Sequence, residues 1–254
     1  MRGQENVALA TSGAAVAATQ VLDFSVLPHA RLRAMRAAGE EVLECLRVLE
    51  KADLNVVGEV LRGHGTFYED EHYPPDDVHD RETHSQYYYH AHRGNESEHG
   101  HFHTFLRAGA IPPGIEPAPY DGTGDRPLGD QAIAHLVAVS MDGDGLPIGL
   151  FCVNRWVSAE TWYRSEDVIA MLDRFRIDHA RPSWPVNRWI TAMLRLFQPQ
   201  IELLLRERDK VVAAWARAHP VSDVYEDRSL EITGAVGIDV ERQVSAVHAA
   251  LVGR

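Results

Sequence analysis

Two short stretches decide the fold: SQYYYHAH at residues 85–92 and HGHFHTFLR at residues 99–107. The first is rich in aromatic residues and the second alternates histidine or polar residues with apolar ones, and both patterns are typical of β-strands. The polar segment 93–98 between them supplies a turn. The sequence therefore predicts an antiparallel hairpin over residues 85–107.

Alternation gathers the histidines of this hairpin on one face, because side chains two residues apart on a strand point the same way. A symmetric turn pairs His92 with His99, His90 with His101 and Tyr88 with His103. The opposite face carries Tyr87, Tyr89, Phe102, Thr104 and Leu106. We expect that second face to pack into the core and the first to line a cavity.

A cluster of imidazoles on one face favours a metal site. Nine of the 14 histidines fall between residues 64 and 103. Opposed Cβ atoms lie about 4.5–5.5 Å apart, so facing imidazoles can converge on one ion with bonds of about 2.0–2.1 Å. Neutral imidazoles buried without partners are costly, and charged ones repel one another. The predicted ligands are His90, His92, His99, His101 and His103, with a metal-free pH switch as the alternative.

Three further residues are candidates for catalysis. Glu96, in the turn, is placed to supply a carboxylate ligand or a general base, and Glu98 is the alternative for either role. Tyr88 and Arg107 share the histidine face, where they are predicted to position a polar or anionic substrate.

The remaining histidines and acidic residues are expected to be structural or solvated. His72, with His64, His79 and His84, lies in polar, loop-like sequence. His135 is expected to pack or lie at the surface, with an approach to the site as the alternative. Asp76, Asp77, Asp80 and Glu82 indicate a solvated acidic loop, with oxygen ligands for a metal as the alternative.

The rest of the chain predicts an α+β fold with about four antiparallel strands covered by N- and C-terminal helices. A second hairpin is expected at 133–141 and 147–156, around the turn signal DGDG. Helical spacing predicts helices at 28–51 and 53–63, from 165, over 186–218 with a kink at Pro199, and from 239. A short β-like run covers 230–236. We predict a flexible arm over 1–27 and one domain over 28–254.

Composition limits the class of partner. The chain has 254 residues and a formal net charge of −12, which disfavours nucleic acid and anionic membrane surfaces. Its two cysteines suit a reducing compartment, so we expect a cytoplasmic protein. A small-molecule partner is expected, and an oligomer is compatible with the sequence.

Two resemblances follow from the histidine segments. QYYYHAH at 86–92 with EHGHFHTFL at 98–106 resembles an uncharacterised family of bacterial proteins with this His-rich signature. Locally, His90, His92 and Glu96 resemble the His-x-His-x3-Glu part of the cupin motif, which implies that these three are ligands. The flanking glycines of that motif are missing, and the chain has too few strands for a cupin barrel.

These observations predict a mononuclear metal-dependent enzyme. Fe(II) is favoured over Zn(II) or Cu, with a non-haem iron oxygenase or oxidoreductase acting on a small polar molecule as the most specific form of the prediction. One alternative is a non-catalytic protein that binds, stores or senses a transition metal. Another is a zinc-dependent hydrolase.

Overall fold

The computed structural model describes residues 22–92, 97–122 and 124–253. The arm predicted for 1–27 lies outside this range except for its end, where Phe24–Val26 forms a short 3-10 helix. Among the described residues, no helix is both long enough and apolar enough to cross a membrane.

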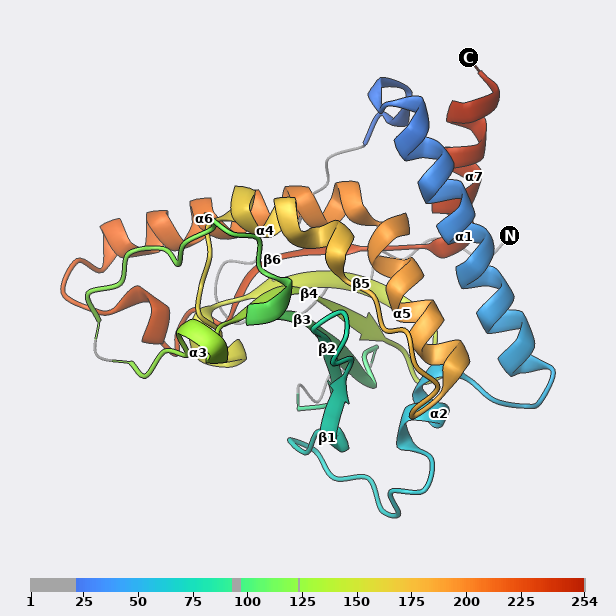
Figure 1. Ribbon diagram of the computed structural model, residues 1–254, viewed down its shortest axis with the longest axis horizontal. Helices are drawn as coiled ribbons and strands as arrows, with labels where there is room; N and C mark the ends of the chain where they lie inside the picture. The colour runs from blue at the N-terminus through green and yellow to red at the C-terminus, as the bar shows by residue number, and fades with distance from the viewer. Residues whose placement is uncertain (1–21, 93–96, 123, 254) are drawn as a thin grey trace.

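The described chain forms a six-stranded antiparallel sheet and seven α-helices (Figure 1). The strands are β1 (Tyr73–His79), β2 (Ser85–His90), β3 (Gly100–Arg107), β4 (Ile133–Met141), β5 (Pro147–Val153) and β6 (Ile232–Gly237). The helices are α1 (His29–Glu50), α2 (Val56–Leu61), α3 (Arg155–Ser158), α4 (Ser165–Met171), α5 (Trp184–Leu196), α6 (Gln198–Ala218) and α7 (Val240–Val252). The strands lie in the sheet in the order of the sequence.

The α+β class is confirmed, whereas the expected number of about four strands was too low. The two additional strands are the edges of the sheet. β1 contains two consecutive prolines and two aspartates, which hide it from a search for alternation, yet proline is tolerated on an edge strand. β6 overlaps the β-like run at 230–236 and extends it to Gly237.

Helices α1, α4, α5, α6 and α7 cover one face of the sheet in two layers (Figure 1). α4, α5 and α6 pack over the strands, and α1 lies on the outer side of α5 with α7 beside it. Buried residues recur along α1 at intervals of three and four, which is the spacing of one helix face. The predicted kink at Pro199 is a full break, because α5 ends at Leu196 and Pro199 occupies the first turn of α6.

The main core lies between the sheet and these helices. Tyr87, Tyr89, Phe102 and Leu106 all belong to it, as the alternation predicted, and the ring of Phe102 lies 5.5 Å from that of Trp189 on α5. The other face of the sheet carries a smaller apolar cluster that includes Phe151 and is packed against by Val157 of α3. The histidines lie on this second face.

Candidate metal site

The β2–β3 hairpin has the predicted register. His90 pairs with His101 and Tyr88 with His103, so the three histidines share the face opposite Phe102. The prediction rested on alternation and on a symmetric turn between the two strands. The turn itself includes Glu96, which lies outside the described residues.

Three histidines bring their ligand atoms together. One ring nitrogen from each of His90, His101 and His103 lies within 4.8 Å of the other two. The Nε2 atoms of His90 and His101 are 2.8 Å apart. His101 and His103 are completely buried, while His90 is only partly buried. The candidate site therefore lies at the boundary between the interior and the surface.

Two neighbours fix the rings of the buried pair. His101 Nδ1 donates to Glu98 Oε1 over 2.7 Å, because a carboxylate only accepts, and this turns His101 Nε2 toward His90. His103 Nδ1 lies 2.9 Å from His135 Nε2. Each ring is thus held through one nitrogen, the arrangement that orients metal-ligating histidines in proteins.

His135 reaches the site because of an irregularity in β4. The pairing of β3 with β4 shifts between Thr104 and Phe105, so Phe105 pairs with His135. The extra residue in β4 changes which side chains face the histidines. Burial, together with the charge of Arg208 and the neighbouring His101, lowers the pKa of His135 to about 3. His135 is therefore neutral at ordinary pH.

The other two predicted ligands lie in different surroundings. The ring of His92 contacts the site, with its centroid 4.9 Å from that of His90 and 5.2 Å from that of His101. His99 is exposed and lies on the Tyr89 side of the hairpin, where its Nδ1 is 2.6 Å from the hydroxyl of Tyr89. The face predicted for His99 was wrong because the residue precedes β3, where alternation does not yet apply.

Tyr88 and Arg107 both face the histidine side. The Tyr88 ring lies 5.2 Å from the rings of both His90 and His103, and burial raises its pKa, with a smaller contribution from Asp77. Arg107 donates from Nε to Gln86 Oε1 at 2.5 Å. One donor of its guanidinium is thus used within the protein.

Two residues near the site were expected to lie in solvated loops. His72 stacks on Tyr88 with ring centroids 3.6 Å apart and contacts the edge of His90 at 5.5 Å. Its Nδ1 lies 2.9 Å from Asp77 Oδ1. The contact between His72 and Asp77 could not be predicted from a regular spacing of residues, because the segment between them contains the two prolines of β1.

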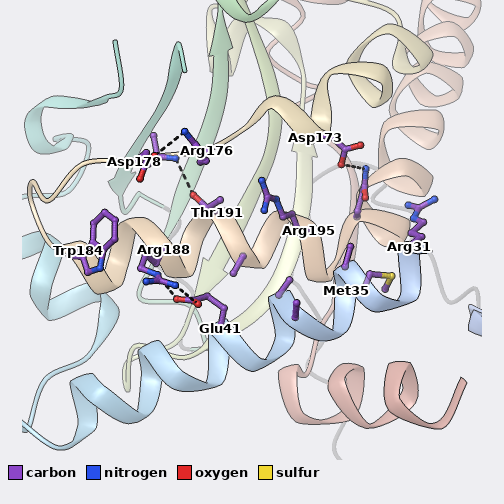
Figure 2. A pocket seen from close by; sticks show the side chains of 16 residues that line it. Arg31, Met35, Glu41, Asp173, Arg176, Asp178, Trp184, Arg188, Thr191 and Arg195 are labelled. Carbon is purple, nitrogen blue, oxygen red and sulfur yellow. Dashed lines mark hydrogen bonds and ion pairs between the residues drawn. The ribbon is translucent and has the colours of Figure 1, made fainter. Parts of the chain in front are cut away.

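A separate hollow lies on the helical side of the molecule. A cavity of about 710 Å³ opens between α1 and α5, and alanines and charged side chains are among the residues that line it (Figure 2). Arg188 pairs with Glu41 across it, and Arg176 pairs with Asp178. The sheet separates this cavity from the histidines.

A comparison with protein-family models shows which family the chain belongs to. Residues 36–238 match the family described as Domain of unknown function (DUF6969), and the chain belongs to that family. The resemblance to an uncharacterised family is thereby confirmed. No curated protein and no solved structure matches the chain.

Proposed function

We propose that this protein is a mononuclear metal-dependent enzyme whose ion is held by His90, His101 and His103. The observation that carries the proposal is the 2.8 Å separation of the Nε2 atoms of His90 and His101. Two imidazole nitrogens this close share either a proton or a metal ion. The carboxylate of Glu98 on the far side of His101 fits a metal ligand, because such a partner orients the ring and raises the basicity of its free nitrogen.

The donor set fits a transition metal. Neutral imidazole suits iron, zinc, copper and nickel, while calcium and magnesium prefer oxygen ligands. Fe(II) is our first choice, and when bound it would supply the redox chemistry of an oxygenase or oxidoreductase. The chain itself would contribute the ligand histidines and the polar side chains beside them, which suit a small polar substrate.

The partial exposure of the site supports an enzyme over a protein that stores a metal in a closed site. His90 and His92 are both partly exposed, so a small molecule has a route to the ion from their side. Three protein ligands leave coordination positions for a substrate or water. Glu98 is committed to His101, which makes it a positioning residue rather than the base of a zinc hydrolase.

A second candidate is a protein that binds or senses a metal without catalysis. It is favoured by His92, whose ring contacts both His90 and His101 and would close the coordination shell as a fourth ligand. X-ray absorption of the loaded protein separates the two functions. A shell of nitrogen atoms with no exchangeable oxygen favours storage or sensing, and a shell with one or more exchangeable oxygens favours catalysis.

Elemental analysis of protein purified without a histidine tag tests the site itself. We expect about one transition metal per chain, lost when His90→Ala is combined with His101→Ala. His248→Ala is the matched control, since His248 is exposed on α7. Reconstitution with Fe(II), followed by the electron paramagnetic resonance signal of a nitric oxide adduct, tests for an open position. A wild-type chain that binds none of Fe(II), Zn(II) or Cu overturns the proposal.

A further inference from the structure

His72 and Asp77 form a pair at the edge of the histidine cluster. His72 Nδ1 lies 2.9 Å from Asp77 Oδ1. Because a carboxylate oxygen only accepts, Nδ1 carries the hydrogen, and in the neutral ring Nε2 then offers a lone pair. The pair therefore presents a hydrogen-bond acceptor of defined orientation.

A chain of side-chain hydrogen bonds holds Asp77 in place. Gln86 donates from Nε2 to Asp77 Oδ2 over 2.6 Å, and Arg107 donates from Nε to Gln86 Oε1. The amide of Gln86 can satisfy both neighbours in one orientation only, since the arginine only donates and the carboxylate only accepts. Gln86 is buried, so solvent competes little for these bonds.

The backbone of β1 is bent in a way that brings the pair together. Asp77 has a φ of 54°, in the left-handed region that residues with a Cβ seldom adopt. The pairing of β1 with β2 shifts over the same segment, between Tyr73 and Val78. Such conformations are costly and concentrate at functional sites.

The His72 ring lies between the candidate ligands and solvent. It stacks on Tyr88 at 3.6 Å with an interplanar angle of 11°, and its edge contacts His90. The His72 side chain is 40% exposed, against 19% for Asp77. A small molecule can therefore reach His72 while Asp77 stays behind it.

We infer that His72 contacts the substrate of the proposed metal site through Nε2, and that Asp77 is the residue that positions it. The substrate class that follows is a small molecule carrying an O–H or N–H donor next to the group that binds the metal. This inference rests on the proposed function.

The first test measures the orientation of the imidazole. Long-range proton–nitrogen correlation spectra of the Zn(II)-loaded protein should show His72 with its hydrogen on Nδ1. Asp77→Ala should shift the population toward the Nε2–H form, because the acceptor for Nδ1 is gone. An unchanged tautomer in Asp77→Ala would overturn the positioning role of Asp77.

The second test measures recognition with two probes that bind metals alike. Acetohydroxamate carries an N–H donor, and N-methylacetohydroxamate does not. The visible spectrum of the Co(II)-loaded protein follows the binding of each probe. His72→Phe should lower the affinity for acetohydroxamate about tenfold. The affinity for the methylated probe should change less than twofold. Phenylalanine keeps the stacking on Tyr88, and His79→Phe, at the exposed end of β1, is the matched control.

The possible outcomes separate the two proposals. If His72→Phe changes the affinities for both probes equally while one metal ion per chain is retained, the proposed contact with the substrate is overturned. The proposed metal site is not affected by that result. A wild-type chain that binds no metal overturns both. A loss of affinity confined to acetohydroxamate supports the inference, because a merely structural role for His72 would change the affinities for the two probes equally.

Discussion

Glu98 and His101 form a buried pair in which His101 Nδ1 donates to Glu98 Oε1 over 2.7 Å, with side-chain exposures of 1% and 0%. The two residues are three positions apart, on either side of the start of β3. A charged or strongly polar pair at this depth needs compensating partners. The ion proposed at His101 Nε2 would be one.

Glu98→Gln is expected to weaken metal binding without abolishing it. The amide keeps the shape of the carboxylate but removes its charge, and the loss of such a partner lowers metal affinity by about 10–100-fold. Competition with a chromophoric chelator measures this affinity. Glu71→Gln, at an exposed position, is the control. Equal affinities of Glu98→Gln and wild type would argue against a metal at His101.

His99→Ala and His101→Ala are expected to differ sharply in metal content. His99 is exposed and contacts Phe67 and Tyr89, whereas His101 belongs to the triad. Elemental analysis should find the wild-type metal stoichiometry in His99→Ala and little metal in His101→Ala. Loss of metal from both variants would return His99 to the set of ligands.

The sequence was sufficient for the register of the β2–β3 hairpin. Side chains alternate strictly along a strand, and a turn taken as symmetric then determines which residues face each other. The pairing of His90 with His101 follows from those two facts. Burial of Phe102 follows in the same way, since it lies on the other face, but its packing against Trp189 of α5 could not be predicted from alternation.

The residues at the edge of the candidate site could not be predicted, because their positions depend on breaks in the alternation of side chains along the strands. His135 faces His103 through the irregularity in β4, and Asp77 meets His72 through a left-handed residue in β1. Neither break has a distinctive sequence signal. Both reflect tertiary packing that overrides local periodicity.

Asp80 should make the stability of the fold depend on acidic pH. Burial alone would raise its pKa, but backbone N–H bonds from Thr83, Asp178 and Glu82 outweigh burial and hold the pKa below the usual 3.8. The ionised form is favoured in the folded state. Its contribution is therefore complete above the unfolded pKa and is lost as the pH falls through the folded one.

Urea unfolding of wild type and Asp80→Asn over a range of pH measures this contribution. At about pH 6 the variant should be less stable by about 1–3 kcal/mol, because its amide cannot accept all three bonds. The difference should narrow below about pH 4, as the wild-type carboxyl becomes protonated. Asp76→Asn, at an exposed position, is the control. A difference that stays constant down to about pH 3 would contradict the assignment.

Gly39 sets how closely α1 and α7 approach. A Cβ on this buried residue would lie 2.7 Å from Val244 Cγ2 on α7 and 3.4 Å from Leu196 Cδ1 on α5. Alanine would favour the helix by about 0.5–1 kcal/mol in isolation, but the overpacking should cost about 1–3 kcal/mol. We therefore expect Gly39→Ala to destabilise the protein by thermal or urea unfolding. Combining it with Val244→Ala removes the clashing methyl groups, so the double variant should be more stable than the sum of the two single effects. If the effects of Gly39→Ala and Val244→Ala on the free energy of unfolding simply add, the helices can move apart freely at this point.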